Sequence, residues 1–272
     1  YFCVMGHKDT DKLALREADG DGVIQRFLAD TARALQMWIV GGTLPLQTTA
    51  PDRVRNTTLV FSPMGDCVAR YDKIHLFHFD NGRELYDEGR VIEAGNTPVH
   101  FDMQARDGQR WRVGLSVCYD LRFPELYRAH ARAGADLLLV PSAFTHTTGQ
   151  AHWEVLLRAR AIENLAYVLA PAQGGVHENG RHTWGRSMLV DPWGTVLAQQ
   201  DQGPGTVTGV LDAERLQKVQ ALGNTQAYSV TPLAPCALGG EEPTYVYHAA
   251  VRHPSDAQRV VGGIGIVFET GR

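Results

Sequence analysis

Segments with apolar residues at helical spacing and short strand-like apolar runs follow one another along the chain. Apolar residues recur at helical spacing over residues 22–35, so we predict a helix there. Pro124, in a first helical turn, predicts another helix that runs to Gly134, and further helices are predicted at 149–164 and 213–222. Short apolar runs bounded by turn residues predict strands at 37–40, 57–61, 67–71, 113–118, 137–142, 166–170, 187–190, 195–199 and 206–211.

Two pairs of these strands are joined by tight turns. Ser-Pro-Met-Gly-Asp at 62–66 and Asp-Pro-Trp-Gly at 191–194 both carry residues that favour hairpins. The other strands alternate with helices. Hairpins mixed with strand–helix–strand units predict an α/β domain with mixed sheets stacked in layers.

The composition of the sequence changes after residue 222. Gly, Pro and Thr are frequent over residues 223–245. An apolar, strand-like run follows at 260–268. We therefore predict one domain over residues 1–220 and an atypical tail over residues 221–272.

Composition narrows the class of partner. The chain has 272 residues and is 44% hydrophobic, so it can bury a sizeable core. Its formal net charge is −4 and its basic residues are scattered, which argues against nucleic acid or a membrane surface as the main partner. No apolar run approaches the roughly 20 residues that a membrane span needs. We expect a small-molecule substrate.

The cysteines and histidines do not form a metal site at any usual spacing. His75 and His78 are two histidines without a second pair of ligands, so we expect no metal site. Widely spaced cysteines do not make a disulfide framework in a chain of this length, so we expect the protein to lie in the reducing cytoplasm. The four cysteines are Cys3, Cys67, Cys118 and Cys236.

Cys118 is the cysteine with a chemically informative position. It ends a predicted strand and stands just before a predicted helix. Backbone N–H groups at a helix N-terminus favour a thiolate and a developing oxyanion. A small buried core residue is the competing interpretation.

Three other side chains could serve Cys118. Lys73 follows a strand among apolar residues, where a fixed positive charge would stabilise an oxyanion and lower a thiol pKa. An exposed loop lysine is the alternative. His152 and Asp120 could complete a cysteine–histidine–acid triad, although His152 lies in a predicted helix.

Several segments together resemble the nitrilase superfamily of carbon–nitrogen hydrolases. The similarity runs from Tyr1 to about residue 220, and the branch that it most resembles contains amidases acting on deaminated glutathione and on ω-amides of 2-oxo acids. The segments are Arg70-Tyr-Asp-Lys-Ile-His-Leu-Phe77, Leu115-Ser-Val-Cys-Tyr-Asp-Leu-Arg-Phe-Pro-Glu-Leu-Tyr127, Pro141-Ser-Ala-Phe-Thr145, Ala151-His-Trp-Glu-Val-Leu-Leu-Arg-Ala-Arg-Ala-Ile-Glu-Asn164 and Gly185-Arg-Ser-Met-Leu-Val-Asp-Pro-Trp-Gly194.

This resemblance implies a four-layer α-β-β-α sandwich with mixed sheets. In the family, the first catalytic glutamate stands in a Pro-Glu-Tyr-Phe-like segment. The start of this chain, Tyr1-Phe-Cys-Val-Met-Gly6, is similar to the residues that follow that glutamate. The resemblance therefore assigns the general base to the position just before Tyr1. It also leads us to expect that the first strand and helix of the fold are lacking and that activity is impaired in the chain as given.

The resemblance also assigns the other catalytic roles. Cys118 is the implied nucleophile, which forms a thioester with the substrate. Lys73 and the backbone N–H of Tyr119 are the implied oxyanion donors, and Glu88 is the implied supporting glutamate. Because the loop before Glu88 is slightly short for the family, Asp87 and Glu84 remain fallback candidates for its role. Because the family uses a glutamate as its general base, the resemblance argues against the cysteine–histidine–acid triad.

The implied substrate is a small amide that carries a carboxylate. Candidate contacts are Arg122, whose guanidinium suits planar anions, and His146, which lies where relatives have a substrate-facing loop. Glu154 is a candidate support for the nucleophile motif. We expect a homodimer that needs no cofactor. The alternatives are a fold-retaining binding protein, a nitrilase proper or an N-carbamoyl amide hydrolase.

Overall fold

The structure is a computed structural model that describes residues 1–272, except 81, 83, 84, 202, 223–229, 233–235, 238–244, 254–255 and 268–272. Within 230–267 it describes the backbone alone. The chain forms two compact units, Tyr1–Gln217 and Lys218–Arg272. The candidate residues that the structure describes all lie in the first unit.

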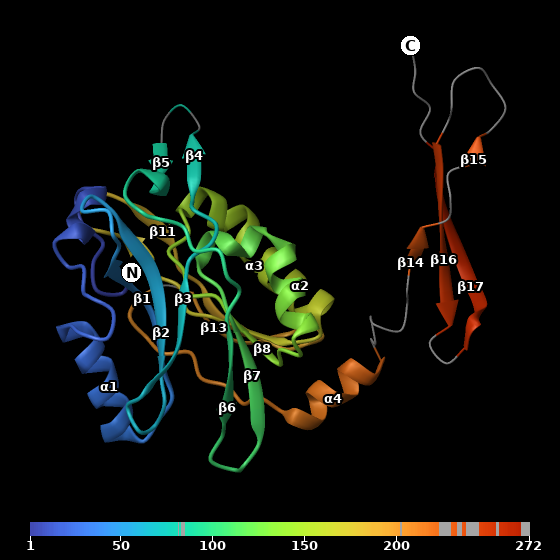
Figure 1. Ribbon diagram of the computed structural model, residues 1–272, viewed down its shortest axis with the longest axis horizontal. Helices are drawn as coiled ribbons and strands as arrows, with labels where there is room; N and C mark the ends of the chain where they lie inside the picture. Colours follow the sequence, from blue (N-terminus) through green and yellow to red (C-terminus); the bar gives the residue numbers. More distant parts are fainter. Residues whose placement is uncertain are drawn as a thin grey trace. The chain divides into compact units, whose positions relative to one another are not determined.

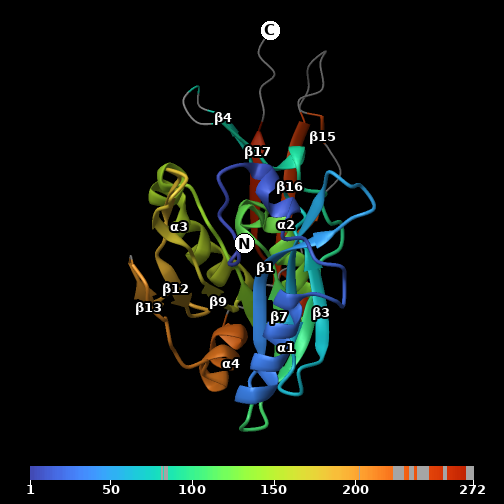
Figure 2. The same ribbon diagram turned by 90° about the vertical axis from the view of Figure 1, so that its left-hand side faces the viewer.

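One sheet of the first unit is antiparallel and follows sequence order. Strands β1 (Ile39–Gln47), β2 (Val54–Phe61) and β3 (Cys67–Asp72) pair in that order. Helix α1 (Val23–Leu35) covers the outer face of this sheet, as Figure 2 shows from the α1 side. Its apolar stripe packs on the strands because residues at helical spacing share one face. The buried residues of this layer are Leu28, Ala32, Leu44, Leu46, Leu59 and Phe61.

The second sheet is mixed. Its order is β13-β12-β9-β8-β7-β6, and β7, β8 and β9 are parallel while the other pairs are antiparallel. The strands are β6 (His100–Gln104), β7 (Arg110–Leu115), β8 (Leu137–Leu139), β9 (Tyr167–Ala170), β12 (Ser187–Val190) and β13 (Val196–Gln200). Helices α2 (Pro124–Arg132) and α3 (His146–Asn164) carry Tyr127, Trp153 and Leu157 into the core shared with this sheet.

The two sheets face each other between the helices. Val60 and Tyr71 of the first sheet belong to the same buried cluster as the second-sheet residues Val113 and Leu138. The layers are therefore α1, first sheet, second sheet, and α2 with α3 (Figure 1). This four-layer α-β-β-α sandwich confirms the predicted fold class.

Short elements lie at the strand ends. They are η1 (Asp9–Leu13), the pair β4 (His78–Asp80) and β5 (Leu85–Asp87), η2 (Glu88–Arg90), η3 (Cys118–Arg122), the pair β10 (Gly174–Val176) and β11 (His182–Trp184), and α4 (Ala213–Leu222). The second unit holds an antiparallel sheet of β14 (Val230–Pro232), β15 (Cys236–Ala237), β16 (Tyr245–His253) and β17 (Asp256–Val267). Over the described part of the chain, no helix is both long and apolar enough to cross a membrane.

Most predicted elements are found, although the strand predicted at 137–142 ends at Leu139 and that at 37–40 extends over Ile39–Gln47. Three further differences have an identifiable cause. The strand predicted at 113–118 ends at Leu115, because the carboxylate of Asp120 takes the Val117 N–H and starts a 3-10 turn instead. Helix α3 begins before residue 149, since the Thr145 side chain caps the N–H of Thr148. The predicted strand at 206–211 was wrong: β13 is the outermost strand of its sheet, and these residues pair with no strand.

Candidate active site

Lys73 stands directly after β3, at the end of the first sheet. Its backbone N–H donates to the Asn56 carbonyl at 2.9 Å, and its own carbonyl accepts from Gly95 at 2.8 Å. The residue is only 1% exposed. A lysine buried this deeply requires a charged partner, because an isolated ammonium is costly to remove from water.

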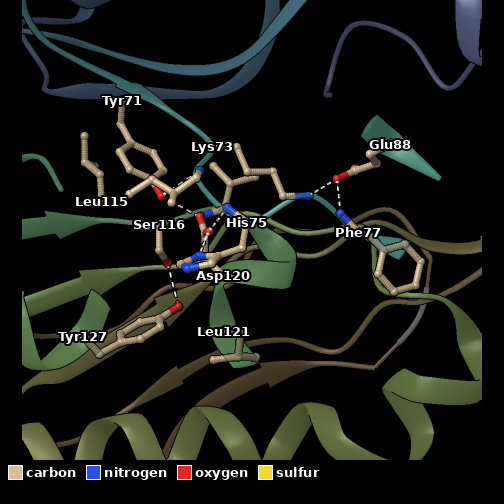
Figure 3. Close-up of polar contacts among 12 residues, drawn as sticks. Tyr71, Lys73, His75, Phe77, Glu88, Leu115, Ser116, Asp120, Leu121 and Tyr127 are labelled. Carbon is tan, nitrogen blue, oxygen red and sulfur yellow. Dashed lines mark hydrogen bonds and ion pairs between the residues drawn. The ribbon is translucent and has the colours of Figure 1, made fainter. Parts of the chain in front are cut away.

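Glu88 is that partner. Its Oε2 atom accepts a hydrogen bond from Lys73 Nζ and another, of 2.8 Å, from the Phe77 N–H (Figure 3). Burial alone lowers the pKa of Lys73, but the negative charge of Glu88 and the hydrogen bond to it oppose this effect, and the net shift of the pKa is upward. The Lys73 ammonium therefore stays charged at neutral pH.

Cys118 is the first residue of η3 and adopts a left-handed backbone conformation, with φ of +53°. Its N–H donates to the Pro141 carbonyl at 3.0 Å. A non-glycine residue in this region costs on the order of 1–3 kcal/mol and persists only where its surroundings enforce it. The sharp turn from β7 into η3 is thus held by the contacts around it.

Asp120 supplies those contacts. It is fully buried, and its Oδ2 accepts from the Val117 N–H at 2.8 Å and from the Tyr71 hydroxyl at 2.7 Å. Its Oδ1 accepts from the His75 N–H at 3.0 Å and lies 2.7 Å from His75 Nδ1 (Figure 3). The carboxylate joins the lysine segment to the cysteine turn.

The resting thiol of Cys118 is protonated at neutral pH. Burial raises its pKa above the ordinary value, Lys73 lowers it, and the negative charge of Glu88 raises it. The net shift is upward. A nucleophile in this state needs a general base to remove its proton.

Lys73, Glu88 and Cys118 line one cavity of about 350 Å³. Its wall comes from the start of the chain, both sheets and the β10–β11 pair. The other lining residues are Tyr1, Phe2, Val4, Met5, Asp9, Lys12, Gly42, Thr43, Asn56, Phe77, Tyr86, Asp87, Val117, Pro141, Ser142, Ala143, Thr145, Pro171, Ala172, Gln173, Arg181, His182, Thr183 and Ser187. A volume of this size suits a small polar substrate.

The predicted substrate contacts are not among these lining residues. The Tyr119 ring packs on Phe77, with centroids 5.1 Å apart. The Arg122 guanidinium lies 5.6 Å from the centre of the Phe144 ring and 3.3 Å from His152.

His146 and Glu154 also lie outside the lining. His146 stacks at 4.0 Å on His182, which does line the cavity. Glu154 forms ion pairs with Arg186 at 3.5 Å and Arg158 at 3.7 Å.

The structure separates the alternatives for the supporting acid and for the base. Asp87 also lines the cavity, but its Oδ1 accepts from the Gly89 N–H, whereas Glu88 pairs with Lys73. Glu84 lies outside the described residues. His152 is exposed and Asp120 is engaged by Tyr71 and His75, so the triad is not assembled.

Sequence reasoning missed a charged group in the cavity wall. Lys12 on η1 and Arg181 before β11 both approach Asp9, at 3.8 Å and 3.0 Å. No motif marks them, because they are far apart in sequence and meet only through the fold. Within the described ranges, no group of three or more His, Cys, Asp or Glu is placed to hold a metal ion.

Comparison with known proteins identifies the family. The carbon–nitrogen hydrolase family matches residues 2–221. Deaminated glutathione amidase of Synechocystis is 39% identical over 222 residues, which are 80% of this chain and 79% of that protein. Human omega-amidase NIT2 is 36% identical over 71% of this chain and 68% of its own length.

A solved structure agrees with these relatives. An amidase from Nesterenkonia, with acrylamide added to its active-site cysteine, has a TM-score of 0.63 and 27% identity over 81% of each chain. The chain thus belongs to the carbon–nitrogen hydrolase family, within the nitrilase superfamily that its motifs indicate, and is a hydrolase that acts on amides.

Proposed function

We propose that the chain hydrolyses the amide of a small carboxylate-bearing molecule, either deaminated glutathione or a 2-oxo acid ω-amide, with Cys118 as nucleophile. The observation that carries this proposal is the meeting of Lys73, Glu88 and Cys118 in one small cavity. A protein that only binds has no need of a buried lysine and a cysteine thiol in the same cavity. The amidase names of the curated relatives favour neither a nitrilase nor an N-carbamoyl hydrolase.

The reaction begins when a general base removes the Cys118 proton, and Sγ attacks the amide carbon. The carbonyl oxygen becomes an oxyanion, which Lys73 and the Tyr119 N–H stabilise. The carbon–nitrogen bond then breaks as the nitrogen takes the proton from the base. Water, deprotonated by the same base, attacks the thioester, and Cys118 regains its proton.

The general base in this proposal is a glutamate joined to the amino side of Tyr1. Tyr1 lines the cavity, and its carbonyl accepts from the Gln173 side chain at 3.1 Å. Because Tyr1 and Cys118 line the same cavity, we propose that a glutamate attached to Tyr1 reaches the thiol.

Ammonia release from 2-oxoglutaramate and hydrolysis of deaminated glutathione test the proposal. A chain extended by Pro-Glu ahead of Tyr1 should hydrolyse at least one of them. Extension by Pro-Gln should lower the rate by roughly 10²–10⁴, and Cys118→Ala in the Pro-Glu chain should abolish it. Equal rates for the Pro-Glu and Pro-Gln chains would place the base within residues 1–272.

We also propose a homodimer formed through α3, in the cytoplasm. Val155 is 61% exposed and Ile162 is 49% exposed on that helix, and Trp193 beside them is 59% exposed. Arg158 Nε donates to the Gly194 carbonyl at 2.8 Å, which holds the β12–β13 turn against the helix. Exposed apolar residues that cluster in this way are typical of an interface. The proposed cytoplasmic location rests on the wide spacing of the cysteines in the sequence, which does not make a disulfide framework.

Light scattering tests the dimer. Val155→Glu combined with Ile162→Glu should convert a dimer into a monomer, because a charge buried in an interface is costly. The matched control is Val68→Glu, which changes a valine that is 47% exposed on β3. A monomeric starting protein, or a double variant that stays dimeric, contradicts the proposal.

A further inference from the structure

Lys12 is a cation in the cavity wall that the proposed chemistry does not use. It lies on η1, and its side chain is 12% exposed. Its Nζ atom is 5.6 Å from the centre of the Tyr1 ring and 3.8 Å from Asp9, beyond hydrogen-bond distance. Burial lowers the pKa of Lys12, while Asp9 and Glu88 raise it and Arg181 and Lys73 lower it.

Lys12 and Arg181 share a single carboxylate. Asp9 is shared by two cations, since Arg181 donates to it at 3.0 Å while Lys12 stands at 3.8 Å. The group of Asp9, Lys12 and Arg181 therefore carries a net charge of +1. The charges of Lys73 and Glu88, deeper in the cavity, satisfy each other. An anion placed at Lys12 would give each of these two cations, Lys12 and Arg181, a partner of its own.

Unpartnered polar atoms mark the same cavity. The Tyr1 hydroxyl, Asn56 Oδ1 and Gln173 Oε1 are buried and have no hydrogen-bond partner within the described structure, and all three residues line the cavity. Asn56 is only 5% exposed. Buried polar groups are rarely left without partners, so such a set indicates a polar ligand. The Tyr1 hydroxyl can donate to an anion, whereas the two amide oxygens accept N–H groups.

We propose that Lys12, with the Tyr1 hydroxyl beside it, binds the carboxylate of the substrate while the amide lies at Cys118. Lys73 is not available for this role, because it serves Glu88 and the oxyanion. Arg181 is held by Asp9 and by the Tyr86 ring, 5.2 Å away. The inference rests on the proposed function and specifies its substrate: an amide with its anionic group at the η1 side of the cavity.

Alkylation of Cys118 tests this charge preference without any hydrolysis. Iodoacetate carries the carboxylate that Lys12 should attract, and iodoacetamide is its neutral counterpart. Both react with the thiolate, so the ratio of their rates is independent of the Cys118 pKa. Mass spectrometry of the Cys118 peptide separates this site from the other cysteines.

Lys12→Gln should lower the iodoacetate to iodoacetamide ratio about tenfold, as expected for the loss of a partly desolvated ion pair. Lys12→Arg should keep most of the preference. Lys8→Gln is the matched control, because it removes the same charge from an exposed lysine in the same segment. Succinate, a dicarboxylate, should protect Cys118 from iodoacetamide in the unmodified chain and not in Lys12→Gln.

The outcomes separate the two proposals. An unchanged ratio in Lys12→Gln, or an equal fall in Lys8→Gln, overturns the role of Lys12 even if the amides are hydrolysed. A ratio that depends on Lys12 supports the anion site even if no amide is hydrolysed, in which case the proposed function alone fails.

Discussion

Replacing Lys73 with methionine should slow amide hydrolysis in the Pro-Glu chain by roughly 10²–10³, the usual effect of removing one oxyanion donor. The same change should raise the pKa of the Cys118 thiol, because the Lys73 charge stabilises the thiolate. The pH dependence of iodoacetamide alkylation at Cys118 measures this pKa directly. Its midpoint should lie above the ordinary thiol value in the parent chain and higher still in the variant.

Glu88→Gln is the matched control for electrostatics, since it should shift the thiol pKa in the opposite direction. The Glu88 carboxylate raises that pKa, so its neutralisation should lower the alkylation midpoint. Lys73→Met alone leaves Glu88 without its partner and should destabilise the fold by about 2–3 kcal/mol. Lys73→Met combined with Glu88→Gln removes both charges and should recover part of the lost stability. Midpoints that move in the same direction for both single variants would contradict this account.

Asp120→Asn should cause the largest loss of stability among single substitutions near the site. In Asp120 both carboxylate oxygens accept hydrogen bonds, from the Tyr71 hydroxyl and from the N–H groups of His75 and Val117. The amide of asparagine has only one acceptor oxygen, and its N–H₂ group would face donors that lose their acceptor. Leaving buried donors unpaired costs on the order of 3 kcal/mol. We expect the thermal midpoint to fall by about 6–12 °C, measured by calorimetry or circular dichroism.

An exposed aspartate provides the comparison for Asp120. Asp52→Asn lies in an exposed turn and should leave the midpoint unchanged. A melting temperature for Asp120→Asn close to that of Asp52→Asn would show that the carboxylate does not hold the turn that positions Cys118. The expected loss is large because four contacts from three residues, in two segments, converge on one fully buried side chain.

Local pattern was sufficient for the elements whose cause is local. The helical stripe at 22–35 appears as α1, and the turn residues at 62–66 and 191–194 do join hairpins. Prediction failed where contacts that apolar periodicity does not report decided the element. The Asp120 carboxylate ended β7 early, and an alternating segment at 206–211 found no strand to pair with.

By itself the sequence determined the family, the layered fold, and the lysine, glutamate and cysteine as candidates for chemistry. These come from contiguous motifs and from periodicity, which are properties of neighbours in the chain. Only the tertiary structure decided which acid faces Lys73, that Asp120 serves the turn and not a triad, and that Lys12 and Arg181 share one carboxylate. Those outcomes depend on burial and on the distances between side chains that the fold brings together. A buried charge removed from water is costly unless it is paired, so the available partners decide the arrangement.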